Sequence, residues 1–331
     1  FHAHHRALGR TRTKILIPDT AHGTNPASAA LCGFTAVPVL SGPQGILEPQ
    51  AVADRMDEDT AGIMLTNPNT LGLFEANIRQ VAEIVHAKGG LVYADGANMN
   101  AVLGVVDMSA MGVDVLHLNL HKTFSTPHGG GGPGAGPVCV TAKLAPYLPV
   151  PRVVQENGRF TWRSDFPLSV GRLHAFYGNF GILVRAYSYI LSLGADLAQV
   201  SRLAVLNANY IQAGLKQDYH LPHDRPCMHE CVFTDQRQLA HKVSALDIAK
   251  RLIDYGFHPP TIYFPLVVSG ALMIEPTESE TKETLDHFIA AMRAIAREAE
   301  QNPELLHQAP HHAKLRRLDE VKAARKPCLM G

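Results

Sequence analysis

In the first part of the chain, short apolar runs alternate with amphipathic segments. Apolar runs that end at Gly, Pro or Asn predict buried strands at 14–18, 36–40, 62–66, 91–95 and 113–118. Between them, an Ala-rich segment at 26–33 and an amphipathic segment at 78–88 predict helices. Strands that are apolar throughout and separated by helices are typical of a mainly parallel sheet covered on both faces. The pattern therefore predicts an α/β fold for this part of the chain.

After about residue 136 the pattern changes. It predicts helices at 176–193, 203–215 and 245–255, and strands at 228–234, 261–265 and 271–274. A capping box at Thr277 and Glu280 is expected to start the last helix. That helix carries one apolar stripe with helical periodicity, made of Leu285, Phe288, Ile289, Met292, Ile295, Ala296 and Ala299. We expect a large domain over residues 1–195 and a small C-terminal α+β domain over 196–331 that includes an extended polar tail.

Composition and charge narrow the classes of function. Of the 331 residues, 46% are apolar and 18% are charged, which allows a buried core and excludes wholesale disorder. Lys and Arg together number 30, as do Asp and Glu, so the basic surplus of a nucleic-acid-binding protein is absent. No apolar run approaches the roughly 18 residues of a membrane-spanning helix. Five cysteines favour a reducing compartment over a disulfide-stabilised fold.

A lysine stands just beyond the predicted strand at 113–118. Lys122 has Asn119, His121 and Thr123 as its polar neighbours. Partial burial among such groups would favour the neutral amine, which suits Schiff-base formation with an aldehyde cofactor. The alternative interpretation is an ordinary surface lysine.

A carboxylate ends the neighbouring predicted strand. Asp95 closes the strand at 91–95, where it can face a crevice and pair with a protonated pyridine nitrogen. Ala97 shares the face of Asp95 at period 2, so it can touch the flat ring whose nitrogen Asp95 meets. The alternative interpretation is a helix-capping aspartate.

Two other patterns suggest sites that we do not expect. The glycines at 129–134 fit a dinucleotide motif, but that motif opens a helix, and the run at 137–141 is strand-like. Cys227, His229 and Cys231 share one face of a predicted strand, with neighbours about 6.7 Å apart, so the outer two cannot share one tetrahedral metal. We therefore predict neither a nucleotide site nor a metal site.

The polar runs at the predicted strand ends resemble one enzyme family. They are AHGTNPAS at 21–28, TNPNTLG at 66–72, YADGAN at 93–98, and HKT at 121–123 followed by PHGGGGPG. Later runs that fit are NGRFTW at 157–162, YGNFG at 177–181, YGFHPPT at 255–261, MIEPTE at 273–278 and RRLDEV at 316–321. Over essentially the whole chain, the combination resembles glycine dehydrogenase (decarboxylating), the P-protein of the glycine cleavage system. This resemblance implies the fold type I, pyridoxal-phosphate-dependent transferase-like architecture.

The resemblance also implies roles for individual residues. Lys122 would form the Schiff base with pyridoxal 5'-phosphate, and Asp95 would hold the proton on the ring nitrogen. His22, the second expected catalytic residue, would stack on the ring face opposite Ala97. Polar contacts to the cofactor or the substrate would come from Thr24, Asn67 and His121.

A reaction and its partners follow from the same resemblance. Glycine would lose CO2, and its aminomethyl group would pass to the lipoyl arm of a carrier, the H-protein. A partner P-protein subunit or a homodimer mate would complete the active site. The location would be the cytoplasm in a bacterium or the mitochondrial matrix in a eukaryote. Family members have a further N-terminal stretch with a Gly-rich segment for the cofactor phosphate, so we expect this chain alone to bind the cofactor weakly.

Two alternatives stay open at this point. The first is another fold type I enzyme of glycine, serine or threonine metabolism, such as a serine hydroxymethyltransferase or threonine aldolase, which would share the lysine and aspartate but need no carrier protein. The second is a non-catalytic interaction subunit. The presence of Lys122, Asp95 and His22 argues against the second.

Overall fold

The computed structural model describes residues 1–330 and divides into two compact units, Phe1–Ala204 and Val205–Gly331. The division falls inside one helix, α7 (Leu197–Leu215). The domain boundary that we place at residue 196 stays a prediction.

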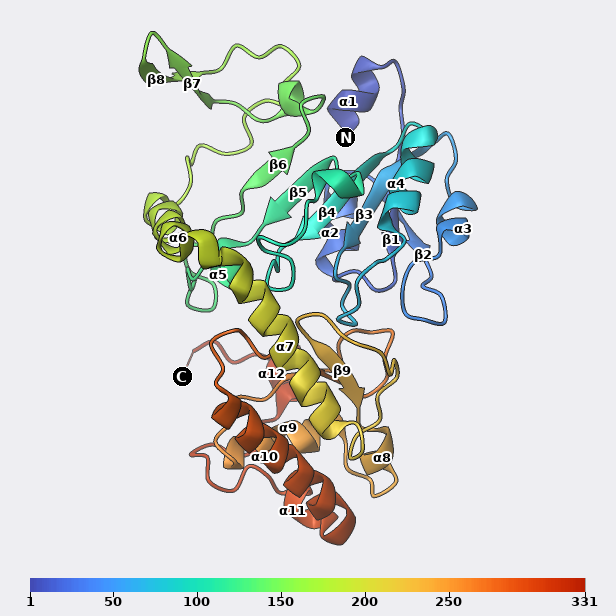
Figure 1. The fold of residues 1–331 in the computed structure, drawn as a ribbon, viewed down its shortest axis with the longest axis vertical. Coiled ribbons are helices and arrows are strands. Elements are labelled where there is room, and N and C mark those ends of the chain that lie inside the picture. The colour runs from blue at the N-terminus through green and yellow to red at the C-terminus, as the bar shows by residue number, and fades with distance from the viewer. Residues whose placement is uncertain (331) are drawn as a thin grey trace. The chain divides into compact units, whose positions relative to one another are not determined.

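The first unit is built on a six-stranded sheet with the order β2-β1-β3-β4-β5-β6 (Figure 1). The strands are β1 (Lys14–Pro18), β2 (Thr35–Val39), β3 (Thr60–Thr66), β4 (Leu91–Gly96), β5 (Val115–Leu118) and β6 (Val138–Val140). All neighbours pair in parallel except β5 and β6, which are antiparallel. The mainly parallel sheet and α/β class predicted from the apolar runs are confirmed.

Alternate residues of the strands point to opposite faces of the sheet and pack into one apolar layer on each face. Leu16 and Ile63 pack with α3 (Pro49–Ala53) and α4 (Ile78–Ala87) on one face of the sheet. Ile15 and Ile17 pack with residues of α2 (Thr24–Leu31) on the other face. Because both faces are covered, the strands need apolar side chains at nearly every position, which explains their continuous runs.

The rest of the first unit was harder to predict. It contains α1 (His2–Ala7), α5 (Leu120–Thr123), a hairpin of β7 (Arg152–Glu156) and β8 (Arg159–Arg163), α6 (Phe180–Leu193), and 3-10 turns at Ser109–Met111, Ala145–Tyr147 and Gly194–Asp196. The sequence analysis missed the hairpin because its strands are exposed along almost their whole length and show no apolar run.

The second unit is an α+β sandwich of one sheet and several helices. Its antiparallel sheet has the order β10-β11-β9, from Thr261–Ile262, Ala271–Ile274 and Cys231–Thr234. The helices are α8 (Gln236–Leu239), α9 (Ala245–Asp254), α10 (Lys282–Gln301), α11 (Pro303–His307) and α12 (Glu320–Arg325), with the second part of α7. Phe233, Ile248 and Met292 are fully buried in the core between sheet and helices.

Helix α10 confirms one prediction and corrects another. Every residue of the predicted apolar stripe is buried. The predicted capping box is wrong, because the N-cap is Thr281, whose hydroxyl accepts a hydrogen bond from the N–H of Thr284 at 3.2 Å. Thr277 instead bonds through its hydroxyl to Ser279 at 2.7 Å in the preceding turn, so it cannot cap the helix.

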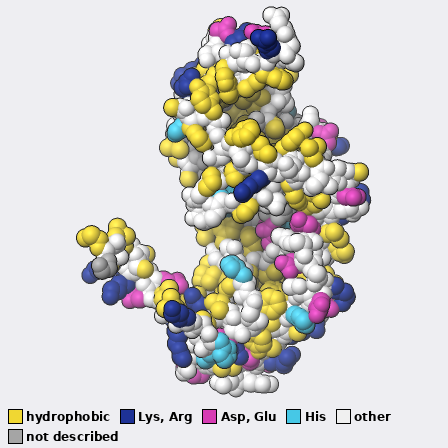
Figure 2. Space-filling view, turned by 90° about the vertical axis from the view of Figure 1, so that its left-hand side faces the viewer, with side chains coloured by type: hydrophobic (Ala, Val, Ile, Leu, Met, Phe, Trp, Pro, Cys, Tyr) yellow, Lys and Arg dark blue, Asp and Glu magenta, His cyan; other side chains and the backbone are white. Residues whose placement is uncertain are grey.

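Residues 180–215 form a helical stretch that, among the described residues, is the one candidate to cross a membrane by length and composition. Only 17% of its most apolar window is buried. Its exposed side chains include Phe180 at 79%, Tyr187 at 63% and Leu191 at 61%. Figure 2 views the molecule from the side of α6 and the β7–β8 hairpin and shows hydrophobic side chains over much of its upper part. A contiguous apolar surface of this kind indicates an interaction surface.

Candidate cofactor site

The residues expected to bind a cofactor follow the carboxyl ends of neighbouring strands. His22 lies between β1 and α2, Asn67 follows β3, and Asp95 is the second-last residue of β4. His121 and Lys122 belong to α5, directly after β5. Because these strands are adjacent and parallel, the structure brings their carboxyl ends to one edge of the sheet, called here the carboxyl edge.

Asp95 is held firmly at this edge and keeps one oxygen free of protein bonds. Its side chain is 4% exposed, and its Oδ1 accepts a hydrogen bond from the N–H of Ala97 at 3.0 Å. The Nε2 of His117 lies 3.2 Å from the same oxygen. Within residues 1–330, no side chain or backbone group bonds to Oδ2. The carboxylate is therefore oriented through one oxygen and can meet a ligand through the other.

His117 is a site residue that the sequence analysis missed. It stands directly opposite Asp95 in the parallel pairing of β4 and β5. Its Nδ1 lies 3.0 Å from the hydroxyl of Tyr93. Burial, followed by the charge of Asp95, raises the pKa of Tyr93 to about 12, so the phenol keeps its proton and can donate a hydrogen bond to Nδ1 when that nitrogen carries no proton. The proton of a neutral His117 is then on Nε2, facing Asp95. Pairing the strands predicted at 91–95 and 113–118 in parallel would have placed His117 opposite Asp95.

The expected partial burial of Lys122 is wrong, because its side chain is exposed. The short helix α5 turns Leu120 and Thr123, three residues apart, toward the interior, and both are buried. Lys122 lies on the opposite side of that single turn. Thr123 is tied to the edge through its hydroxyl, which accepts a hydrogen bond from the N–H of Met99 at 2.9 Å. Lys122 therefore lies directly after β5, at the carboxyl edge, with its side chain exposed to solvent.

His121, in α5, contacts the glycine loop, residues 128–134. Its ring makes an edge contact with His128 at 4.4 Å between centroids. Burial, then the charges of His128 and Lys122, lowers the pKa of His121 and keeps it neutral at pH 7. The carbonyl of Gly134 accepts a hydrogen bond from Asn179 Nδ2 at 2.5 Å, which connects the loop to the start of α6.

His22 and Thr24 are both exposed and belong to one turn. The N–H of Thr24 donates to Nδ1 of His22 at 3.1 Å. A neutral His22 therefore carries its proton on Nε2.

Buried polar atoms without a hydrogen-bond partner gather at the carboxyl edge. They are Nδ2 of Asn67, Oγ1 of Thr66, Oγ1 of Thr20, both amide atoms of Asn25, and Nδ1 of His121. Native proteins bond nearly all such atoms, so a group of them at and just beyond the carboxyl ends of β1, β3 and β5 indicates a polar ligand. The phosphate and ring oxygens of pyridoxal phosphate would accept from the amide and hydroxyl donors among them, so the residues fit that cofactor. Thr20 and Asn25 were not singled out by the sequence, because Thr and Asn are common in loops.

The second unit contains a cluster away from this edge. Cys227 and Cys231 are buried in its core, but the predicted strand face is wrong, because β9 begins at Cys231 and leaves Cys227 and His229 in the preceding loop. Nε2 of His229 lies 3.8 Å from Glu230 and 3.9 Å from Glu275. One ligating atom from each of these three residues lies within 4.8 Å of the others. The separations are those of ion pairs between one histidine and two carboxylates.

Two family models match the chain. The model described as "Glycine dehydrogenase, C-terminal domain" matches residues 200–313. The model described as "Aminotransferase class-V" matches residues 2–132.

Solved structures with similar folds support the same assignment of architecture. An inhibitor-bound glycine decarboxylase (P-protein) of the glycine cleavage system aligns with TM-score 0.71 and 18% identity, over 88% of this chain and 67% of that chain. A cysteine desulfurase from Escherichia coli aligns with TM-score 0.67 and 18% identity, over 87% of this chain and 73% of that chain. The predicted fold type I architecture is confirmed.

Curated relatives are far more similar in sequence. A protein named probable glycine dehydrogenase (decarboxylating) subunit 2 from Caldanaerobacter subterraneus subsp. tengcongensis is 56% identical over 98% of this chain and 67% of its own length. The protein of the same name from Bacillus licheniformis is 57% identical over 99% of this chain and 68% of its own length. At this identity and coverage, the chain belongs to the family of glycine dehydrogenase (decarboxylating) subunit 2.

Proposed function

We propose that this chain is a pyridoxal-phosphate-dependent, glycine-decarboxylating subunit that transfers the aminomethyl group to the lipoyl arm of an H-protein. The observation that carries the proposal is the 56% identity, over 98% of the chain, to relatives named glycine dehydrogenase (decarboxylating) subunit 2. The layout of the carboxyl edge adds independent support, because it combines a lysine, an anchored aspartate and unpaired polar atoms.

Lys122 and Asp95 are the residues that we propose to hold the reactive part of the cofactor. The bound cofactor supplies an aldehyde that takes up an amine and a ring that accepts the electron pair left when the carboxylate of glycine departs as CO2. Lys122 would provide the amine in the resting enzyme. Asp95, oriented by Ala97 and His117, would stabilise a proton on the ring nitrogen through Oδ2.

The remaining positions would orient the cofactor and shield one side of it. His22 would stack on the face opposite Ala97, with its ring turned by the bond from Thr24 to Nδ1. Asn67 uses Oδ1 to accept the N–H of Glu75 at 3.0 Å, so its unpaired Nδ2 is the group left for a ligand. Thr24 and His121 complete the proposed set of polar contacts.

The exposure of Lys122 bears on the second half of the reaction. A lipoyl group is carried on another protein and must reach the reacting carbon from solvent. Lys122 lies at the surface of this chain, where such an arm can reach it. The open site is therefore consistent with an H-protein as the acceptor.

We also propose that a second P-protein subunit covers the apolar surface of the first unit. Phe160 is 76% exposed and Trp162 is 57% exposed on β8, and Phe180 is 79% exposed at the start of α6. An isolated two-stranded hairpin is at best marginally stable in water, so β7 and β8 need a partner surface. The name "subunit 2" of the relatives favours a companion chain as that partner. Since the curated relatives come from bacteria, we propose the cytoplasm as the location.

The test is exchange of labelled bicarbonate into the carboxyl group of glycine, with purified chain, companion subunit and pyridoxal phosphate. We expect exchange that requires lipoylated H-protein and is lost when the carrier lacks its lipoyl group. Exchange or aldol cleavage without any carrier would identify another fold type I enzyme. Absence of exchange despite bound cofactor would identify a non-catalytic subunit and overturn the proposal.

A further inference from the structure

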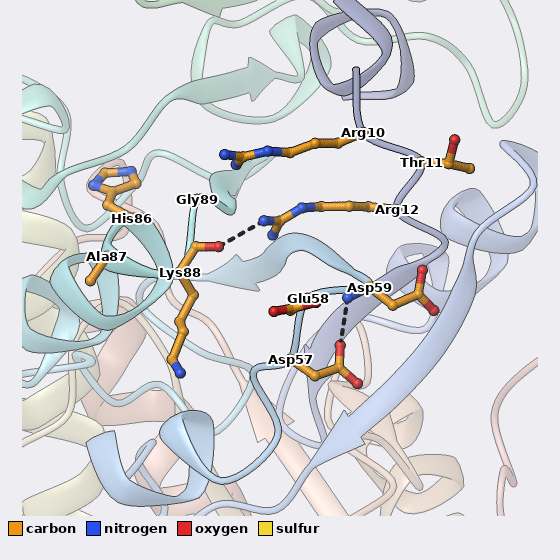
Figure 3. A pocket seen from close by; sticks show the side chains of 10 residues that line it. All are labelled: Arg10, Thr11, Arg12, Asp57, Glu58, Asp59, His86, Ala87, Lys88 and Gly89. Atoms are coloured by element: carbon orange, nitrogen blue, oxygen red, sulfur yellow. Dashed lines mark hydrogen bonds between the residues drawn. The ribbon is translucent and has the colours of Figure 1, made fainter. Parts of the chain in front are cut away.

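The amino ends of the strands contain a pocket that the proposed function does not use. The cavity measures about 900 Å³, and its lining comes from three segments, residues 10–12, 57–59 and 86–89. These segments directly precede β1, β3 and β4. The pocket therefore lies at the edge of the sheet opposite the carboxyl edge, called here the amino edge (Figure 3).

Arg12 is a buried charge at this edge. Its side chain is 5% exposed, and it donates from Nη1 to the carbonyl of Thr60 at 2.5 Å and from Nη2 to the carbonyl of Lys88 at 2.8 Å. Its Nε is buried and has no hydrogen-bond partner. No carboxylate of residues 1–330 forms an ion pair with Arg12. Two neutral carbonyls are a weak replacement for the water lost by a guanidinium.

Arg10 brings a second positive charge to the same point. A Cβ on Gly89 would lie 2.7 Å from Nη1 of Arg10 and 3.1 Å from Nη2 of Arg12. Gly89, with φ +72°, leaves that space open. Burial, then the charge of Arg10, lowers the pKa of Arg12, and the charges of Glu58, Asp57 and Asp59 oppose that shift in part. The backbone N–H of Arg10 donates to the carbonyl of His5 at 2.9 Å, but its guanidinium forms no hydrogen bond or ion pair with another residue that the structure describes.

The carboxylates that line the pocket are engaged elsewhere or exposed. Asp57 pairs with Lys14 at 2.5 Å, and Asp59 accepts from the N–H and the hydroxyl of Thr13 at 2.9 and 2.7 Å. In Figure 3 the carboxylates of Asp57 and Asp59 point away from the guanidinium groups of Arg10 and Arg12. Glu58 is exposed. The carboxylates act on Arg12 through their charge, but none of them forms an ion pair with Arg10 or Arg12, so both guanidinium groups beside Gly89 are without a bonded anion among the described residues.

We propose that the corner of the pocket beside Gly89 binds a small phosphate dianion between Arg10 and Arg12. Two guanidinium groups at one point offer planar N–H donors that match phosphate oxygens, and a dianion compensates both charges where a single carboxylate would compensate one. The ligand would stabilise the first unit, because it binds only when Arg10, Arg12 and Gly89 are brought together by the fold.

The test uses chemical modification of arginine in the enzyme loaded with pyridoxal phosphate, so that the cofactor fills its own phosphate site. Phenylglyoxal labelling of each arginine is followed by peptide mapping, with and without inorganic phosphate at constant ionic strength. At about ten times its dissociation constant, phosphate should slow labelling of Arg10 roughly tenfold. Arg79, an exposed arginine of α4 outside the pocket, should be labelled at an unchanged rate.

A variant pair provides the second measurement. Arg10→Gln should abolish the phosphate-dependent rise in melting temperature without lowering the melting temperature in phosphate-free buffer, because Arg10 is exposed and makes no ion pair with a described residue. Arg79→Gln should retain the full rise. Equal protection of Arg10 and Arg79, or a full rise in Arg10→Gln, would overturn the proposal.

Discussion

The two edges of the six-stranded sheet differ in how their polar side chains are hydrogen-bonded. At the amino edge, Thr13, Lys14 and Thr60 bond to the carboxylates of Asp57 and Asp59 within one network. At the carboxyl edge, buried atoms of several Asn, Thr and His side chains have no partner. A folded chain rarely leaves buried donors unpaired unless something else binds them. The amino edge also has unpaired buried atoms, Nε of Arg12 and Nδ1 of His5, but its carboxylates Asp57 and Asp59 are bonded within the chain, whereas the unpaired atoms of the carboxyl edge lie beside the residues that we propose to hold the cofactor.

The strongest test of this division is Lys122→Ala. Removing the amine should abolish covalent cofactor binding and turnover, while the exposed position makes a loss of stability small. Borohydride reduction and peptide mapping should place the label on Lys122. Lys88→Ala, which removes an exposed side chain at the amino edge, should leave labelling and turnover unchanged. A label on Lys14, Lys88 or Lys143 would refute the assignment.

The next largest effect is expected for Asp95→Asn. An amide cannot stabilise the proton on the ring nitrogen, so turnover should fall by about 10²- to 10³-fold even with cofactor bound. The amide oxygen can still accept from the N–H of Ala97, which preserves the local backbone. Asp107→Asn, an exposed carboxylate in the same unit, should have no such effect. Near-normal turnover of the Asp95 variant would remove it from the site.

The third prediction concerns the pH dependence of stability, through His5 at the amino edge. His5 is 1% exposed and bonds through Nε2 to the carbonyl of Ala61 at 2.9 Å. Burial above all lowers the pKa of His5 to about 4. Between pH 6.5 and 4, His5 binds a proton in the unfolded chain but stays neutral in the folded chain. The contribution of this histidine to the free energy of unfolding is therefore fully present at pH 7 and declines by at most about 3 kcal/mol as the pH falls.

Urea unfolding at pH 7, 5.5 and 4 measures this loss. His5→Gln should show a smaller decline over the same range, because one of the groups that take up a proton on unfolding is gone. An identical pH profile for both proteins would assign the decline to other histidines.

The smallest effect is expected at Asn67, and Asn69 in the same loop after β3 provides the comparison. Asn67→Asp keeps an oxygen for the N–H of Glu75 but removes the unpaired Nδ2. The dissociation constant of pyridoxal phosphate should rise at least about tenfold, because a donor is replaced by a carboxylate that repels the phosphate, and this buried charge should also lower the free energy of unfolding without cofactor.

Asn69→Ala is the matched control for that loop. Asn69 is 1% exposed and bonds to Gly45, Leu71, Leu73 and Glu75. Its removal should cost about 3 kcal/mol of stability, because buried partners lose their bonds. If Asn67→Asp left the dissociation constant of pyridoxal phosphate unchanged while lowering stability, the unpaired amide would have a structural role instead.

Much of the fold could be predicted because its signals are local. The bounds predicted for the strands at 14–18 and 271–274 agree with β1 and β11, and the apolar stripe of α10 is buried throughout. The β7–β8 hairpin could not be predicted, since both strands are exposed and pair only with each other. For the site, residues at the ends of predicted strands were accessible to sequence reasoning, and their roles remain predictions.

The sequence by itself determined the apolar periods, the class of fold and the presence of a lysine and an aspartate after neighbouring strands, because each depends on residues close together in the chain. Only the tertiary structure decided that His117 faces Asp95, since that pairing depends on the register of β5 against β4. It also decided that Lys122 is exposed, through the one turn of α5 that buries Leu120 and Thr123 instead. The position of Arg10 and Arg12 beside Gly89 is also a tertiary property. Arg12 and Gly89 are 77 positions apart in the sequence, and the sheet order β1-β3-β4 brings the segments before β1 and β4 together.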